Sequence, residues 1–485
     1  MIFQQRDLEP VAATLTVWIQ TKLSSRTAGD REGTRRAQAL PAGLEDVRVE
    51  NLSVPGAGLS NETLFCDLRY TARGATRRER LVLRLEQREH LVFPDYDLSI
   101  QWRILEALAA TDVHVPRVRW IEPDAAVLGS PFYVMERIDG LIPSDVPPYH
   151  AAGAMTELRP AERAAIWWHG LEEMAKIHRL DPDAHGLGFL AKTRFGVDPL
   201  EQELGYWTHY LAWAAGGSAQ PTTEAALAWL REHRPPSTRR RLCWGDARLP
   251  NLIFRGERVV GVLDWEMAFL GDPAADLAWW LFLDWHHSAG NRIPRLPGLP
   301  SREETIRRWE ELVGLESGDL HYWEVFAAMR FAVIMVRVAA IMQEVGTPTP
   351  TPDFQTNNVP TQHLAALLGL PPPGQGAGIV TDVRDATIRV QFDLTGDGGY
   401  QWYLVADRGT GTRVDGRAEA AQVTVTAAAA DWHALQRGEL DRAQAFLSGR
   451  LKIDGDISIM MQLEPMISAL ALAGAGATYT MDDGA

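Results

Sequence analysis

The stretch Leu242–Phe254, LCWGDARLPNLIF, carries polar side chains at a spacing with chemical meaning. Asp246 and Asn251 form a D-x-x-x-x-N pattern, and Asp264 follows in GVLDWEMAFLGDPAADLAWW, after a strand-like run. Phosphoryl transfer needs one carboxylate that orients an acceptor hydroxyl and takes its proton. A second carboxylate and an amide oxygen suit a magnesium ion, which prefers hard oxygen ligands. D-x-x-x-x-N alone recurs by chance, but all the motifs in this order indicate a phosphoryl-transfer site.

Composition excludes several kinds of partner. The 485 residues suffice for two to four domains, and the net charge is −15, with 63 acidic and 48 basic residues. Because there is no run of five basic residues, we expect no nucleic-acid or anionic-membrane partner. The two cysteines, Cys66 and Cys243, suggest neither a metal site nor a disulfide framework. The N-terminus lacks the pattern of a secretory signal, so a cytoplasmic location is expected by elimination.

The most apolar long stretch is VFAAMRFAVIMVRVAAIM, residues 325–342. Arg330 and Arg337 interrupt it seven residues apart, on one helical face. A buried amphipathic helix explains this pattern better than an integral membrane segment.

Changes of pattern divide the chain. A helix is expected at about 7–23, short strands from Val47 to Leu85, and mostly helices from about 140 to 345. Pro- and Gly-rich pieces at 346–360 and 369–378 are typical of a linker. Three strands expected to be antiparallel, TIRVQFDL, GYQWYLVAD and AQVTVTA, then form a separate α+β module with several helices. The predicted domains lie at 1–139, 140–370 and 371–485; the family resemblances described below imply a nucleotide-binding lobe, a helical catalytic and substrate lobe, and a lipid-binding module, in that order.

The motifs WGDARLPNLIF, GVLDWEMAFLGDPAADLAW, GLSNETLFCDL and FYVMERIDG resemble the aminoglycoside phosphotransferase-like kinase family. The resemblance covers roughly residues 20 to 370. It is closest to the branch that includes the kinase-like portions of acyl-CoA dehydrogenase fusion proteins. It implies an α+β, two-lobed protein-kinase-like fold with a small β-rich N-lobe and a helical C-lobe. It also implies ATP and Mg²⁺ as cofactors.

By this resemblance Asp246 is the catalytic base, and Asn251 and Asp264 are the magnesium ligands. Asp276 is expected to support the catalytic loop from a helix; the alternative is a helix N-cap or a surface carboxylate. Trp244 departs from the histidine that the family often has there. We interpret it as a packing variant, since tryptophan can fill the space and donate one hydrogen bond.

The nucleotide side is expected to begin in a Gly-rich turn. Gly58 permits close backbone approach, and Ser60 and Asn61 offer polar groups; such turns are common, so the signal is weak alone. The next strand carries Arg84 where the family has a phosphate-binding lysine. Arginine keeps the charge but changes reach and geometry, and a solvated edge-strand residue is the alternative. The partner glutamate expected on the following helix is replaced by Gln101, with Glu106 on a different face.

The segment YVMERIDG is expected to be the hinge whose backbone around Glu136 and Arg137 meets the adenine. His178, near carboxylates at the end of a helix, is interpreted as structural. The tryptophan pairs Trp167–Trp168 and Trp279–Trp280 could line an apolar cleft, but helical spacing favours core packing.

The segment AFLSGRLKIDGD resembles the sterol carrier protein domain, over roughly residues 376–482. This resemblance implies a five-stranded sheet with helices enclosing an apolar tunnel. Phe446, Leu451 and Met460 are candidate tunnel residues, and ordinary core packing is the alternative for each of them.

We interpret the chain as an ATP- and Mg²⁺-dependent phosphotransferase. It would move the γ-phosphoryl group to a hydroxyl of a small, lipophilic or acyl-bearing molecule, and an acyl or sterol lipid would occupy the C-terminal module. An aminoglycoside or another antibiotic is the alternative substrate. Two further alternatives are a pseudokinase, because Arg84 and Gln101 replace the usual ion pair, and a lipid-binding or transfer protein with the kinase fold as scaffold. The sequence leaves the oligomeric state open.

Overall fold

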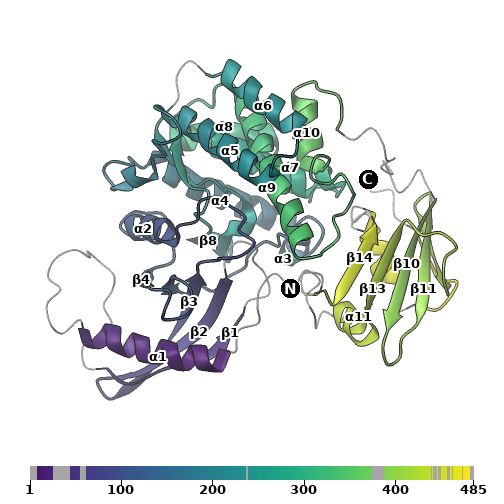
Figure 1. The fold of residues 1–485 in the computed structure, drawn as a ribbon, viewed down its shortest axis with the longest axis horizontal. Coiled ribbons are helices and arrows are strands. Elements are labelled where there is room, and N and C mark those ends of the chain that lie inside the picture. Colours follow the sequence, from purple (N-terminus) through teal and green to yellow (C-terminus); the bar gives the residue numbers. More distant parts are fainter. Residues whose placement is uncertain are drawn as a thin grey trace.

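The computed structural model describes residues 8–25, 44–54, 62–235, 239–373, 387–437, 440, 445, 449–455, 459–460, 463–471 and 473–480. Figure 1 shows a β-rich N-terminal lobe, a larger helical lobe and a C-terminal sheet. The predicted α+β two-lobed fold is therefore confirmed.

The N-terminal lobe is a five-stranded antiparallel sheet in the order β1-β2-β3-β5-β4. Its elements are α1 Leu8–Ser25, β1 Glu45–Ser53, β2 Glu62–Ala72, β3 Ala75–Leu85, α2 Leu98–Leu108, β4 Val118–Glu122 and β5 Phe132–Glu136. Alternation along β3 sends Leu81, Leu83 and Leu85 into a core with α1. Val82 joins the core of the helical lobe. By the same alternation, Arg84 faces the helical lobe rather than α1.

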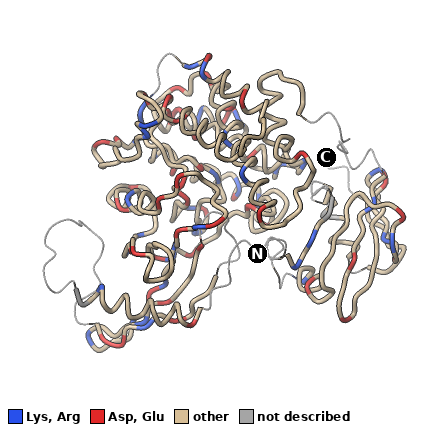
Figure 2. The backbone as a smooth tube through the Cα atoms, in the orientation of Figure 1, with Lys and Arg blue, Asp and Glu red and all other residues tan. Residues whose placement is uncertain are grey.

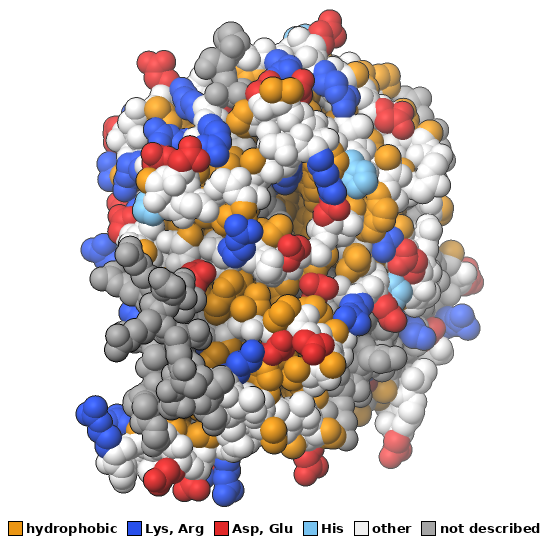
Figure 3. All heavy atoms as spheres, turned by 60° about the vertical axis from the view of Figure 1, so that its left-hand side comes forward, with side chains coloured by type: hydrophobic (Ala, Val, Ile, Leu, Met, Phe, Trp, Pro, Cys, Tyr) orange, Lys and Arg blue, Asp and Glu red, His pale blue; other side chains and the backbone are white. Residues whose placement is uncertain are grey.

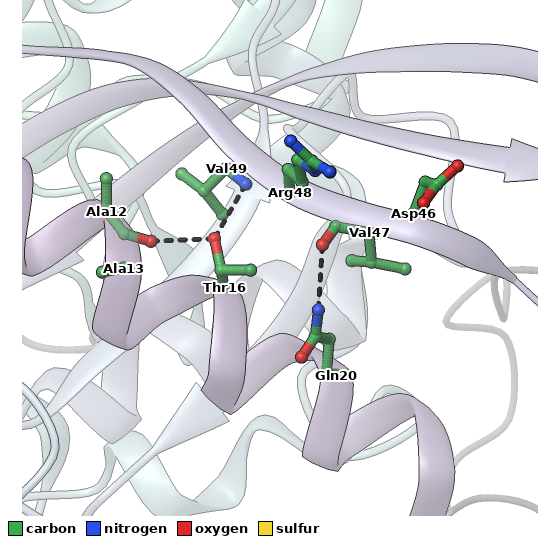
Figure 4. A pocket seen from close by; sticks show the side chains of 8 residues that line it. All are labelled: Ala12, Ala13, Thr16, Gln20, Asp46, Val47, Arg48 and Val49. Carbon is green, nitrogen blue, oxygen red and sulfur yellow. Dashed lines mark hydrogen bonds between the residues drawn. The ribbon is translucent and has the colours of Figure 1, made fainter.

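Helix α1 also protects the edge strand β1. Thr16 Oγ1 accepts a hydrogen bond from Val49 N at 2.9 Å, and Gln20 Nε2 donates to Val47 O at 3.0 Å (Figure 4). Unpaired backbone N–H and C=O groups on an edge strand can pair with a strand of another chain. The contacts with α1 occupy two such groups on β1.

The helical lobe surrounds α9 Leu320–Glu344, which packs against α5, α6, α7 and α10. The other elements are α3 Ala154–Glu157, α4 Pro160–Arg179, α5 Pro199–Ala215, α6 Pro221–Glu232, β6 Arg241–Cys243, β7 Leu252–Arg255, β8 Arg258–Val262, β9 Phe269–Gly271, α7 Ala274–His287, α8 Arg302–Val313 and α10 Val359–Leu367. Short 3-10 helices lie at Leu187–Leu190, Leu249–Asn251 and Ala289–Asn291. Figure 2 shows acidic and basic residues interspersed along both lobes.

Helix α9 is the one described helix whose length and composition would suffice to cross a membrane. Its most apolar window is 67% buried inside the protein, as expected for the core helix that the sequence predicts. Residues 346–360, expected to be linker, lead into α10, a short helix that was expected between the two Pro- and Gly-rich pieces. There Asn358 caps the helix by accepting from Thr361 N at 3.0 Å.

The C-terminal module is a six-stranded sheet in the order β14-β13-β10-β11-β12-β15. Its elements are β10 Thr387–Thr395, β11 Gln401–Asp407, β12 Thr410–Asp415, β13 Val423–Ala428, α11 Ala429–Gln436, β14 Leu451–Gly455, α14 Glu464–Leu470 and β15 Thr478–Thr480. The expectation of five strands was wrong, because β15 pairs with β12. The sheet is also mixed: β10 and β13 run parallel, whereas all-antiparallel strands were expected.

Candidate active site

The site is built on two loops that are fastened to each other. The first, residues 244–251, joins β6 to β7, and the second begins where β8 ends. Leu263 N donates to Asn251 O at 2.9 Å. Trp244 Nε1 donates to the carbonyl oxygens of Leu263, at 2.8 Å, and Asp264, at 3.1 Å. The structure therefore brings the loops that carry Asp246, Asn251 and Asp264 together.

The Asp246 carboxylate is fixed by three donors. Trp279 Nε1 donates to Oδ1 at 2.8 Å, while Arg248 Nε at 2.9 Å and Asn251 Nδ2 at 2.7 Å donate to Oδ2. An ionised carboxylate can accept about four hydrogen bonds, so one position remains for a hydroxyl. Because its Nδ2 serves Asp246, Asn251 retains its amide oxygen for another group. Neither Trp279 nor Arg248 was assigned this contact from the sequence.

Asp264 has an unusual backbone and an unusual environment. Its φ of 59° lies in the left-handed region, which Asp tolerates better than most residues and which is frequent at functional sites. Burial raises the pKa of its carboxyl group; the Arg84 guanidinium opposes the rise, the Asp246 carboxylate adds to it, and Arg248 opposes it. Two carboxylates thus share a buried site, where a divalent cation would relieve their repulsion.

Asp276, in the first turn of α7, supports the catalytic loop. Its carboxylate accepts from Trp244 N at 2.6 Å and from Gly245 N at 2.9 Å. His178 Nε2 is 3.0 Å from Asp276 Oδ2, and Trp309 Nε1 donates to His178 Nδ1 at 3.0 Å. Because Nδ1 accepts, Nε2 carries the proton that is donated to Asp276. The geometry agrees with a supporting Asp276 and a structural His178; what each does in the reaction stays a prediction.

Residue 245 must be a glycine, because its backbone lies very close to the second loop. Its φ is +88°, and an added Cβ would lie 2.0 Å from the carbonyl oxygen of Met267. Only glycine fits this contact, which brings the chain before Asp246 against the chain after Asp264.

Arg84 is paired, but not with the residue expected from the sequence. Its Nη2 lies 3.1 Å from Glu266 Oε1, and the two side chains are 20% and 4% exposed. Gln101 instead accepts a hydrogen bond from the Tyr133 hydroxyl at 3.4 Å. The neighbouring Tyr133, Glu266 and Asp264 raise the pKa of Arg84 against the effect of burial. Arg84 therefore reaches across the lobes to the loop of Asp264, and the solvated-edge alternative does not hold.

The remaining nucleotide-side predictions fare differently. Gly58, Ser60 and Asn61 lie outside the described residues. Glu136 N donates to Arg117 O, and Arg137 N donates to Arg80 O, both at 2.9 Å. These two hinge amides already serve the sheet, so an adenine contact through this segment stays a prediction that requires other groups.

Arg248 connects the catalytic loop to a second polar network. Its Nη1 is 2.6 Å from Asp145 Oδ1, and His287 Nε2 is 3.1 Å from the same oxygen. Burial alone would raise the pKa of Asp145, but Arg248 and His287 hold it well below its ordinary value. The nearby loop exposes Ile142 and Val146, at 48% and 64%. Sequence reasoning missed this network, although Arg248 stands two residues after Asp246.

The open pocket between α1 and β1 is not this site. It is lined by Ala12, Ala13, Thr16, Gln20 and residues 46–49 (Figure 4). Its Thr16 and Gln20 side chains are engaged in fastening α1 to β1. Figure 3 shows, on another view, a hollow with hydrophobic side chains in its wall and charged side chains around its rim.

Two of the three predicted tunnel residues are described. Leu451 is buried on β14, and Met460 is half-buried against the core of the C-terminal module. Phe446 lies outside the described residues. Both described side chains are placed as core residues, so a lipid-lining role stays a prediction.

Two lobes and a fastened pair of acidic loops define a kinase-like phosphotransferase. The chain belongs to the phosphotransferase enzyme family, whose model matches residues 52–309. Residues 381–468 match the SCP-2 sterol transfer family, so the C-terminal module is a domain of that kind. The resemblances stated from the sequence are thereby confirmed.

Curated relatives point to the same branch. The chain is 34% identical over 275 residues to acyl-CoA dehydrogenase family member 10 of Mus musculus, covering 55% of this chain and 24% of that protein. It is 30% identical over 304 residues to family member 11 of Rattus norvegicus, covering 61% and 36%. The chain thus spans about a quarter to a third of the length of these relatives.

A solved structure supports the fold alone. A protein from Ralstonia eutropha assigned to the aminoglycoside phosphotransferases is 22% identical, with a TM-score of 0.50. The match covers 73% of this chain and 95% of that protein.

Proposed function

We propose that the protein transfers the γ-phosphoryl group of ATP to a hydroxyl of a small, lipophilic or acyl-bearing molecule. The observation that carries the proposal is the Asp246 carboxylate, held by three donors with one accepting position left, beside Asn251 and Asp264. Such pre-organisation suits a reaction in which the protein mainly positions groups and balances charge.

The residues fit a magnesium ion. Asp264 and the amide oxygen of Asn251 are hard oxygen donors, and burial with a second carboxylate disfavours ionised Asp264 unless a cation is present. The described residues contain no group of three or more His, Cys, Asp or Glu with metal-holding geometry. This agrees with Mg²⁺ bound through one or two side chains and completed by substrate phosphates and water. When bound, the ion would neutralise phosphate charge.

The chain's own groups would act as follows. Asp246 accepts a hydrogen bond from the acceptor hydroxyl and takes its proton as the oxygen bonds to the γ-phosphorus. The bond between that phosphorus and the bridging oxygen breaks, and ADP leaves. Arg84 would hold phosphate oxygens, and its guanidinium donates to Glu266, which would fix its orientation.

The pairing of Arg84 with Glu266 supports an active kinase over the pseudokinase alternative. Gln101 stands where the family has a glutamate, but Glu266 pairs with Arg84. The Arg84 guanidinium therefore still has a carboxylate partner. The SCP-2 match supports a lipophilic acceptor or a bound acyl or sterol lipid over an aminoglycoside. The lipid-transfer alternative concerns the C-terminal domain and is compatible with an active kinase.

We also propose a cytoplasmic location. Cys66 and Cys243 are free and buried, which fits a reducing compartment. ATP is abundant in such a compartment.

The test is transfer itself. Wild-type protein with MgATP and a panel of acyl- and sterol-bearing alcohols should yield a product heavier by one phosphoryl group, measured by mass spectrometry. D246N should lower kcat about 10²- to 10⁴-fold, as expected for loss of a general base. Its melting temperature should fall, because the new NH₂ group faces hydrogen-bond donors, so kcat is compared at a temperature at which both proteins are folded. ATP binding without transfer to any alcohol, equal in wild type and D246N, would contradict the proposal.

A further inference from the structure

Arg330 is a buried arginine whose position the proposed function leaves unexplained. It lies in the middle of α9 with 0% of its surface exposed. Its Nε and Nη1 atoms have no hydrogen-bond partner in the described part of the chain. Among the described residues no carboxylate forms an ion pair with it, and an unpaired buried charge destabilises a fold.

Four aromatic rings surround the guanidinium instead. Its Cζ lies 4.5 Å from the ring centroid of Trp279, 5.2 Å from Trp207, 5.5 Å from Phe326 and 5.6 Å from Phe269. These rings come from α7, α5, α9 itself and β9, so the side chain lies where four elements meet. Cation–π attraction offsets part of the desolvation, but burial still lowers the pKa of Arg330.

Two contacts lead from Arg330 to the catalytic loop. Its Nη2 donates to the carbonyl oxygen of Gly245 at 2.7 Å, one residue before Asp246. The ring over which it lies closest, Trp279, donates through Nε1 to Asp246 Oδ1 at 2.8 Å. The Arg330 guanidinium therefore contacts the backbone of the residue before Asp246 and also the Trp279 indole, which donates to the Asp246 carboxylate.

We propose that Arg330 is a positioning residue for phosphoryl transfer, fixing the catalytic loop through Gly245 and Trp279 rather than stabilising the helical lobe. The inference rests on the proposed function, in which Asp246 is the base. It explains why a core helix retains a charge among four aromatic rings, where an apolar residue of similar volume could take its place without loss of stability.

The test compares R330M with R330K and with R337M. Arg337 lies on the same helix but contacts Leu91 O, Glu344 and the Trp213 ring, far in sequence from the catalytic loop. We expect R330M to keep or raise the wild-type melting temperature while kcat falls about 10- to 100-fold, with KM for ATP within about twofold. R330K should recover part of kcat, and R337M should leave kcat near wild type.

A second readout does not depend on activity. Hydrogen exchange of peptides covering residues 242–254 should be faster in R330M than in wild type and unchanged in R337M. If wild type transfers no phosphoryl group, the proposed function fails, and exchange alone decides whether Arg330 orders the loop. R330M with wild-type kcat and exchange, or with a melting temperature lowered in step with its activity, would overturn the inference.

Discussion

At the scale of single residues, the pair Arg84–Glu266 distinguishes this site. The guanidinium stands on β3 of the N-lobe, and the carboxylate follows Asp264 by two residues in the helical lobe. An ion pair between β3 and α2 would hold the Arg84 guanidinium within the N-lobe. This pair instead joins Arg84, the residue proposed to bind phosphate, directly to the proposed metal loop.

Removal of the Glu266 charge should weaken nucleotide positioning. We expect E266Q to raise KM for ATP about 10-fold, because a charge-assisted hydrogen bond contributes about 1.5–3 kcal/mol. Steady-state kinetics with varied ATP measure the change. The matched control is E106Q, which removes the same charge from α2, the helix where the partner acid was expected, and should leave KM unchanged. Equal KM values in E266Q and wild type would show that Arg84 needs no such partner.

The raised pKa of Asp264 predicts a pH dependence of metal binding. A carboxyl whose pKa is raised by folding favours the folded state at low pH, and this contribution is lost as pH rises through the folded pKa. Protons therefore compete with Mg²⁺ at a higher pH than they would at an ordinary aspartate. Thermal-shift measurements with Mg²⁺ and ADP should show a stabilisation that shrinks on acidification and is absent in D264N. A shift that is equal at every pH would contradict the assignment.

At the scale of elements, α7 supports the loop through its first turn. Asp276 accepts two backbone N–H groups and is oriented by His178, and all these groups are buried. An asparagine offers one acceptor oxygen and forces an NH₂ group toward donors. D276N should therefore lower the free energy of unfolding by about 3 kcal/mol and lower kcat as well.

The neighbouring Asp272 provides the control for D276N. It lies just before the same helix and accepts from Ala274 N at 3.0 Å, a hydrogen bond that the side-chain oxygen of an asparagine can also accept. D272N should therefore unfold close to wild type in urea denaturation. If D276N and D272N have the same free energy of unfolding, the hydrogen bonds between Asp276 and the loop do not contribute measurably to stability.

At the scale of the whole molecule, the described residues form separate cores. One core fills the helical lobe and one face of the N-terminal sheet, a second lies between that sheet and α1, and a third belongs to the C-terminal domain alone. Domains with their own cores unfold as units.

The first two cores share the N-terminal sheet, whereas the third stands alone. We therefore predict two thermal transitions in calorimetry of the full chain. Mg²⁺ with ADP should raise the melting temperature of the transition that belongs to the two kinase lobes and leave the other unchanged. A fatty acid should do the reverse if the C-terminal domain binds lipid. A single transition shifted by both ligands would show that the domains are coupled.

The amino-acid sequence was enough to predict which side chains meet in the candidate site, because Asp246, Asn251, Asp264 and Asp276 lie within one short segment whose spacing reflects local loops. The resemblance carried by its motifs implied the two-lobed fold, and the apolar pattern of residues 325–342 indicated that α9 is buried, since hydrophobic patterns report burial. The strand count and the parallel pair of the C-terminal sheet were not accessible, because pairing partners are distant along the chain.

Contacts between residues that lie far apart along the chain could be identified only from the folded structure. Glu266 reaches Arg84 over 182 residues, and Arg330 reaches Gly245 over 85. Alternation and helical spacing indicate which way a side chain points, but not which charge it meets. The physical reason is that a charge pair between lobes depends on how the lobes pack, and that packing is a property of the whole fold.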